Sequence, residues 1–195
     1  MTWTTGVTTG AQMAADWNDL SARFALPMYA ELMLVGENSS AISPVGLGDA
    51  NKVNVTYGAA QGVITDPVSL SANGEITFTT IDSYWISFYF QFGRTTSSGT
   101  SNLVLRSVGD GTPIGTVISE KVTNPDDTKG IELHIPFTPP YVPFVLKGEI
   151  MRDTNGANDG GLVPYQPVET VGGWSARAAP SASIFIYRIK TQGTV

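Results

Sequence analysis

The densest apolar segment of the chain spans residues 75–94, and its second half alternates between apolar and other positions. Five apolar side chains occupy every second position: Tyr84, Ile86, Phe88, Phe90 and Phe92. A period of two predicts a β-strand with one face in the core. The opposite face carries Trp85 and Tyr89, and two large rings are more than a solvated face requires. We therefore expect this second face to contact a partner; the alternative is an ordinary strand with two chance surface aromatics.

A second strand near the C-terminus is apolar on both faces. In the segment SIFIYRI, Ile184 and Ile186 lie on one side, whereas Phe185, Tyr187 and Ile189 lie on the other. Continuous apolar runs of this kind are typical of strands that are buried on both faces. This strand and the strand at residues 84–92 are thus predicted to present aromatic groups beyond a single core.

Short strands separated by Gly, Ser, Asn, Asp and Pro residues account for most of the chain after Pro27. We predict strands at residues 31–35, 52–57, 62–70, 75–80, 84–94, 102–108, 115–122, 130–137, 143–152 and 183–189. Ten short strands with turn residues between them indicate an all-β sandwich or jelly roll. The long loop at residues 153–180 is expected to serve a function or form an interface.

The N-terminal residues follow a helical pattern instead. Met13, Trp17, Leu20 and Phe24 form one apolar stripe on a predicted helix that begins near Thr9 and ends before Pro27. The helix is too short to be stable alone in water, so its stripe must pack on the β domain, on copies of itself or on a partner. Together with Trp3, the stripe suggests an attachment segment at residues 1–27, followed by a β domain at residues 28–195.

Composition removes several classes of protein. The chain of 195 residues is 42% hydrophobic, carries a formal charge of −6 and has eleven scattered Lys and Arg residues. No basic cluster is present to bind nucleic acid. Without cysteine, neither a disulfide nor a thiolate metal site can form. The sequence has no signal peptide and no apolar run of membrane-spanning length. We expect a protein without membrane or nucleic-acid partners that is assembled in a reducing cytoplasm.

Residues with catalytic or metal-binding potential are sparse. His134 is the only histidine, on the polar side of a predicted strand, where a triad would need a nucleophile and a carboxylate brought to it. The turn around Asp127 presents paired carboxylates that we interpret as solvated. Asp153, Asn155 and Asp159 offer hard oxygen ligands, but their spacing favours a plain turn. We expect no catalytic residue, no bound metal and no cofactor.

The order of apolar patterns resembles a known family. EITFTT, YWISFYF, SNLVLR, FVLKGEI and a closing SASIFIYRI follow one another in an order similar to the strands of the tumour-necrosis-factor and C1q-like jelly roll. The match covers roughly residues 31–190. Two positions depart from the family pattern, because Ser83 replaces its glycine and Glu149 its aspartate. The resemblance implies a homotrimer whose inner sheets meet at a threefold axis, with Trp85, Tyr89, Phe185 and Tyr187 at the interface.

A second resemblance lies at the N-terminus. The segment TTGVTTGAQMAADWNDLSARF is similar to a segment near the start of many bacteriophage fibre and appendage proteins. The two resemblances together imply a non-enzymatic phage virion protein, a trimeric head decoration or short head fibre that attaches to the major capsid protein or another virion protein. Its predicted attachment residues are Trp3, Met13, Trp17, Leu20 and Phe24. The alternative is the receptor-binding knob of a tail fibre, in which Tyr141, Tyr165 and Trp174 stack on a host surface glycan.

Overall fold

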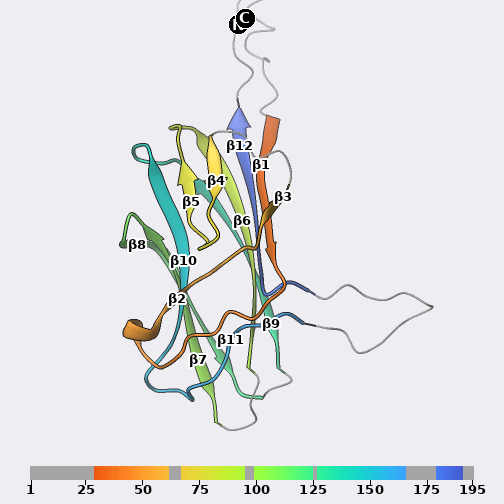
Figure 1. Ribbon diagram of the computed structural model, residues 1–195, viewed down its shortest axis with the longest axis vertical. Coiled ribbons are helices and arrows are strands. Elements are labelled where there is room, and N and C mark those ends of the chain that lie inside the picture. Colours follow the sequence, from red (N-terminus) through yellow and green to blue (C-terminus); the bar gives the residue numbers. More distant parts are fainter. Residues whose placement is uncertain (1–28, 62–66, 95–98, 125–126, 166–178, 191–195) are drawn as a thin grey trace, which may run out of the picture.

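The computed structural model describes residues 29–61, 67–94, 99–124, 127–165 and 179–190. Within these ranges the chain forms two antiparallel sheets that face one another (Figure 1). The predicted N-terminal helix and its five attachment residues lie outside the described residues, as does Trp174.

The first sheet has its four long strands in the order β1, β12, β6 and β9. Their bounds are β1 Tyr29–Asn38, β12 Ala182–Lys190, β6 Ser83–Gly93 and β9 Lys129–Phe137. Two short strands complete this sheet: β3 (Ala60–Gln61) lies beside β1, and β11 (Gly161–Leu162) pairs with the far end of β6.

The second sheet has the order β4, β5, β10, β7 and β8. Its strands are β4 Val68–Leu70, β5 Ile76–Phe78, β10 Phe144–Arg152, β7 Ser101–Gly109 and β8 Thr112–Val122, with β2 (Val53–Asn54) paired to β10 and the 3₁₀ turn η1 at Asp49–Asn51. Strands that are adjacent in a sheet are mostly distant in the chain, as in two interleaved Greek keys. The strand order confirms the predicted jelly-roll sandwich.

The alternation of β6 produces the core. Tyr84, Ile86, Phe88, Phe90 and Phe92 all point between the sheets and are buried. Rings from the second sheet meet them, and the centroids of Phe78 and Tyr84 lie 4.8 Å apart. The predicted core strand is therefore confirmed, and its burial provides much of the hydrophobic stabilisation of the fold.

Most predicted strands are present with small changes at their ends. Two are much shorter than expected: the strand predicted at 52–57 is reduced to β2, and of the strand predicted at 62–70 the described part is β4. Two short strands, β3 and β11, were not predicted, because two residues are too few to show an alternation. The remainder of the predicted loop at 153–180 lies in irregular structure or outside the described residues.

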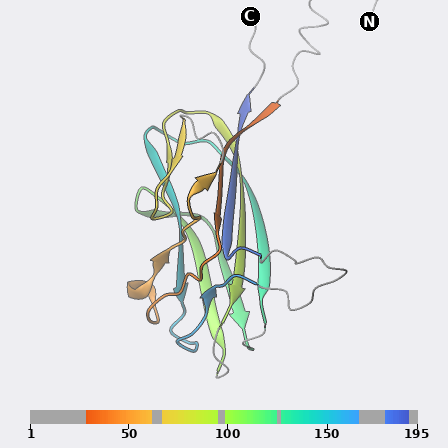
Figure 2. The ribbon, with the colours of Figure 1, turned by 45° about the vertical axis from the view of Figure 1, so that its right-hand side comes forward.

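Both ends of the described chain lie at one end of the sandwich. Tyr29 at the start of β1 pairs with Lys190 at the end of β12, and these strand ends lie together at the top of Figures 1 and 2. The opposite end carries the loops that follow β6, β8 and β10. Residues 1–28 are thus joined to the sandwich at the end distant from these loops.

Two buried arginines organise the loops at that distant end. Arg94 is 3% exposed, and its Nε lies 3.2 Å from Asp159 Oδ2 while its guanidinium also donates to the carbonyl oxygens of Gly99 and Thr123. Arg152 donates from Nε to the carbonyl of Gly160 at 2.9 Å, and burial lowers its pKa. The guanidinium of Arg94 thus replaces lost water with carbonyl and carboxylate acceptors, and that of Arg152 with carbonyl oxygens of Gly160 and the Asn158 side chain, as buried cations require.

Candidate functional site

The outer face of the first sheet carries a row of apolar side chains across all four long strands. The backbone register places Leu32 opposite Tyr187, Tyr187 opposite Trp85, and Trp85 opposite Pro136. Directly paired residues of an antiparallel sheet project to the same side. Four strands therefore contribute to one continuous surface, although their residues are up to 155 positions apart in the chain.

The neighbouring register positions extend this surface. Val35 lies opposite Phe185, and Ile189 lies on the same side as Tyr187. We call this surface the apolar face and define it by Leu32, Val35, Trp85, Phe185, Tyr187 and Ile189. Leu32 is 48% exposed, Trp85 41% and Phe185 39%. Single exposed apolar residues are ordinary, but a contiguous set of this kind marks an interaction surface.

Polar residues occupy the same face toward the loop-bearing end of the sandwich. Glu37, Ser183, Tyr89 and Glu132 follow one another in register across β1, β12, β6 and β9. They surround an open depression of about 290 Å³ that Ser87, His134 and Phe185 also line. Burial and the nearby carboxylate of Glu132 raise the pKa of Tyr89. The outer face of the first sheet thus has an apolar end and a polar end.

His134 makes contacts that resemble part of a catalytic triad. Its Nδ1 lies 2.9 Å from Ser87 Oγ, and its Nε2 lies 3.9 Å from Glu132 Oε2. The carboxylate is beyond hydrogen-bonding distance, and both ring and carboxylate are at least half exposed. The amide groups around Ser87 belong to strands paired on both sides, so they do not form an oxyanion hole. The imidazole instead stacks on Trp85, with centroids 6.1 Å apart.

A second apolar hollow opens at the edge of the sandwich between β8 and β9. It has a volume of about 400 Å³, and its lining includes Ile114, Ile135, Pro136 and Phe137 together with the buried core side chains Ile86 and Leu146. His134 lines both this edge cleft and the depression on the outer face. The exposed surface therefore continues around the β9 edge into the space between the sheets.

The four predicted interface residues are brought together on one face. Trp85 and Tyr89 of β6 and Phe185 and Tyr187 of β12 all project outward from adjacent strands. The sequence reasoning missed Leu32 and Val35 of β1. A register shift between Leu32 and Leu34 interrupts the alternation of this strand, so its apolar run does not show which residues face outward. The five predicted attachment residues lie outside the described part of the chain.

The residues considered for other chemistry are dispersed. Tyr141 lies in the loop between β9 and β10 and donates a hydrogen bond to Asp110 at 2.5 Å, whereas Tyr165 pairs with Ala179 beyond β11. These two rings lie toward opposite ends of β6, and do not form one sugar-stacking platform.

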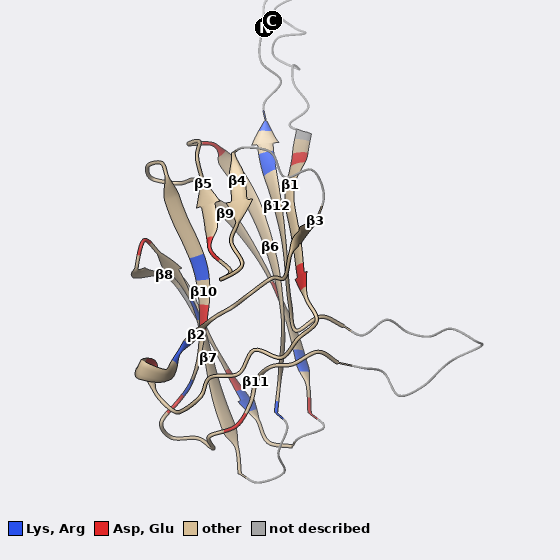
Figure 3. Cartoon of the chain, viewed as in Figure 1, with Lys and Arg blue, Asp and Glu red and all other residues tan. Residues whose placement is uncertain are grey.

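The turn at residues 153–159 is held by the protein's own groups. Asp153 Oδ1 accepts a hydrogen bond from the backbone N–H of Asn155 at 2.8 Å, and Asp159 is paired with Arg94. Among the described residues, no cluster of three or more His, Asp or Glu side chains could hold a metal ion. Lys and Arg positions are scattered along the described strands and loops and alternate with Asp and Glu positions (Figure 3).

No family model and no curated protein sequence matches the chain. Solved structures with a similar fold include the globular domain of zebrafish complement 1qA protein (10% identity, 83% of this chain and 100% of that chain, TM-score 0.47). Eiger TNF from S. frugiperda is 12% identical over 85% and 96% of the two chains, with a TM-score of 0.48. Vertex protein P5 of the phage PRD1 is 14% identical over 85% and 100%, with a TM-score of 0.46.

No helix of the described residues is long and apolar enough to cross a membrane.

Proposed function

We propose that this protein is a non-enzymatic structural protein of a phage virion, a trimeric head decoration or short head fibre. The observation that carries the proposal is the apolar face, since three of its side chains are 39–48% exposed in the single chain. A contiguous face of this kind is stabilised when another protein surface removes it from water. The sequence resemblance to trimeric jelly rolls, with this sheet directed inward, favours copies of the same chain as that surface.

The edge cleft supports a closed ring of copies. It lies around the β9 edge from the apolar face and is a different surface of the same chain. A contact between the edge of one copy and the face of the next is head-to-tail, and such contacts generate a ring when the rotation closes. Three copies arranged in this way would bury both apolar surfaces and shield the edges of β8 and β9.

Attachment to the virion is assigned to residues 1–27, which carry Trp3, Met13, Trp17, Leu20 and Phe24. Two features support this division. The segment resembles the start of phage appendage proteins, and it joins the sandwich at Tyr29, at the end distant from the loops after β6, β8 and β10. A larger shell bound at this end would leave those loops pointing outward. The partner would be the major capsid protein or another virion protein, and the protein would reside in the virion.

Removal of residues 1–26 tests the proposal. The fragment 27–195 should remain folded and trimeric, because the core and the apolar face lie within it, but it should no longer bind particles that lack the protein. Co-sedimentation with such particles measures binding, and light scattering measures mass. If the fragment still binds particles, attachment lies elsewhere; if it binds host cells, the receptor-binding alternative is favoured; and if it aggregates, the helix belongs to the core.

A further inference from the structure

Three exposed apolar side chains lie in two loops at the end of the sandwich where β1 begins and β12 ends. Ile81 is 59% exposed and belongs to the loop at residues 79–82 between β5 and β6. Tyr141 is 52% exposed, Val142 is 39% exposed, and both belong to the loop at residues 138–143 between β9 and β10. We call these three side chains the end patch. They take part neither in the apolar face nor in the edge cleft.

The strand ends that carry the two loops are neighbours. Phe78 at the end of β5 pairs with Phe144 at the start of β10, and Tyr84 near the start of β6 pairs with Phe137 at the end of β9. The rings of Phe78 and Phe137 have their centroids 5.1 Å apart. Both loops therefore project from adjacent strand ends, at the end of the sandwich where the described chain starts and finishes (Figures 1 and 2).

The Tyr141 ring is held in place although half of it is exposed. Its hydroxyl donates a hydrogen bond to Asp110, and its ring packs edge-on against Phe144 with centroids 5.6 Å apart. The other carboxylate oxygen of Asp110 accepts a hydrogen bond from the backbone N–H of Val145 at 3.0 Å. A ring that is fixed in this way loses little conformational freedom when a partner covers it.

Polar contacts on both sides of Ile81 hold the other loop. Thr80 Oγ1 donates to Asp82 Oδ2 at 2.6 Å and lies 2.8 Å from the hydroxyl of Tyr84. Arg188 Nη2 lies 2.6 Å from the same oxygen of Asp82. The carboxylate next to Ile81 is thus paired within one chain, so a partner can cover Ile81 without burying an unpaired charge.

The end patch lies close to the point where residues 1–28 join the sandwich. Ala30, Ile189 and Ser83 follow one another in register across β1, β12 and β6. Adjacent strands are about 4.8 Å apart, so the end of the β5–β6 loop is roughly 10 Å from the first residues of β1. Phe24 is five residues before Tyr29, which is a reach of at most about 18 Å. A virion protein that binds Phe24 therefore also comes close to the end patch.

We propose that the end patch docks on the virion protein that binds residues 1–27, against an apolar area beside the binding site of that segment. The inference rests on the proposed function and adds a second contact to it. Once the N-terminal segment is bound, the patch meets its partner within one complex, at a high effective concentration, so a contact that is weak alone raises the affinity of the whole protein. The fragment 27–195 keeps the patch but loses this advantage.

Paired substitutions in the full-length protein test the docking surface. The double variant Ile81→Asp and Val142→Asp places two charges in the end patch, and both side chains are exposed, so the free protein should keep its mass and melting temperature. Co-sedimentation with particles that lack the protein should show binding about tenfold weaker than that of the natural chain. Val45→Asp is the matched control, because Val45 is 82% exposed in a loop outside the end patch; it should bind as the natural chain does.

Three other results would overturn the proposal. If the double variant binds as tightly as the Val45→Asp control, the end patch does not touch the virion, and attachment through residues 1–27 stands without it. If the free double variant has a lower mass or melts several degrees lower, the patch is covered by the protein's own chain or by another copy. If the natural full-length protein itself fails to bind the particles, the proposed attachment is wrong and the docking surface with it.

Discussion

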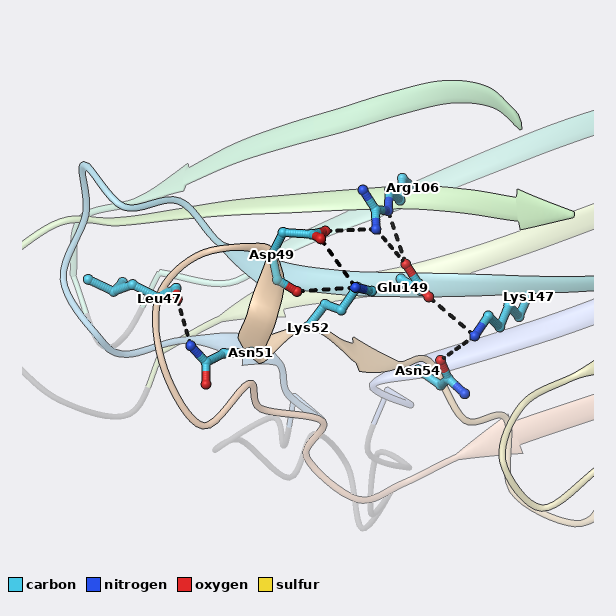
Figure 4. Close-up of polar contacts among 8 residues, drawn as sticks. All are labelled: Leu47, Asp49, Asn51, Lys52, Asn54, Arg106, Lys147 and Glu149. Atoms are coloured by element: carbon cyan, nitrogen blue, oxygen red, sulfur yellow. Dashed lines mark hydrogen bonds and ion pairs between the residues drawn. The ribbon is translucent and has the colours of Figure 1, made fainter. Parts of the chain in front are cut away.

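The outer faces of the two sheets differ in how they meet their surroundings. On the second sheet, Glu149 is 4% exposed and accepts hydrogen bonds from Arg106 Nε and Nη2 at 3.0 and 2.9 Å. Lys147 Nζ lies 3.2 Å from its other oxygen, and Asp49 of the η1 turn contacts Arg106 at 2.7 Å (Figure 4). The loop that contains η1 covers this face, and the charges are satisfied within one chain.

The outer face of the first sheet has no such cover among the described residues. Its central side chains, Trp85, Phe185 and Tyr187, are apolar and partly exposed. A sheet face that is covered by a loop and an ion-pair network needs no partner chain and can face water. A bare apolar surface is suited to a partner that removes it from water. In the proposed trimer, the second sheet would therefore face outward and the first sheet inward.

The largest effect is expected from charges placed on the apolar face. Trp85→Arg or Tyr187→Arg would bury unpaired cations in the proposed interface, at a cost of several kcal/mol per site, and should convert the trimer to monomers. Sedimentation equilibrium measures the change. Val45→Arg is the matched control, because Val45 is 82% exposed in a loop outside this face; it should leave the mass unchanged. Equal behaviour of the three variants would contradict the assignment of the face.

The second-largest effect is expected on the outer face of the second sheet, which the η1 loop covers. It should lower the free energy of unfolding and leave the oligomeric state unchanged. Glu149→Gln removes the carboxylate that pairs with Arg106 and Lys147. Because both cations are partly solvated, we expect a loss of about 2 kcal/mol in the free energy of unfolding, below the usual cost of breaking a fully buried pair. Urea denaturation measures the loss, and the trimer should persist at high protein concentration. If Glu149→Gln dissociates the trimer without lowering the free energy of unfolding, the outer face of the second sheet, and not that of the first, would form the interface.

A smaller effect is expected at the rim of the same network. Lys52 and Asp49 form an exposed pair at 3.2 Å, and such pairs contribute little. Lys52 and neighbouring Arg106 together lower the pKa of Asp49. Lys52→Ala should therefore leave the urea midpoint almost unchanged, in contrast to Glu149→Gln. A loss as large as that of Glu149→Gln would show that the network depends on its rim.

The smallest effect lies between the two sheets, at Tyr57. Its hydroxyl is fully buried without a hydrogen-bond partner in the described structure, and burial raises its pKa. The folded state therefore holds the Tyr57 hydroxyl proton more tightly than the unfolded state does. Because of this difference, the free energy of unfolding is unaffected by Tyr57 ionisation below about pH 10 and decreases as the pH rises further. Tyr57→Phe should reduce this alkaline loss and leave neutral stability equal or slightly higher. Thermal melts at pH 8 and above pH 10 measure the stability near neutral pH and its decrease at alkaline pH. If Tyr57→Phe loses as much stability above pH 10 as the natural chain, the assignment to Tyr57 is wrong.

The sequence predicts the long strands well because local pattern determines them. The alternation in β6 identifies the core side chains and also the outward Trp85 and Tyr89, and the two-sided apolar pattern of β12 identifies Phe185 and Tyr187. These features depend on side-chain period alone. The prediction that β12 is buried on both faces is wrong within a single chain: the side of Ile184 and Ile186 is buried, whereas Phe185 on the other side is 39% exposed.

Features that depend on pairing between distant segments could not be predicted. The contribution of Leu32 to the apolar face requires the register of β1 against β12 and the shift beside Leu34. The pairing of Arg106 with Glu149 joins residues 43 positions apart, and nothing local marks either residue as a partner. The edge cleft similarly depends on how β8 and β9 diverge, which is a property of the assembled sandwich.

The mass of the natural full-length chain in solution tests the central claim most directly. Sedimentation velocity at micromolar concentration should give a single species of three chains, because the apolar face of each copy is covered by the others. The trimer should persist at high salt, since burial of apolar surface is not screened as charge pairs are. A monomer at this concentration would contradict the claim that the outer face of the first sheet is an interface between copies.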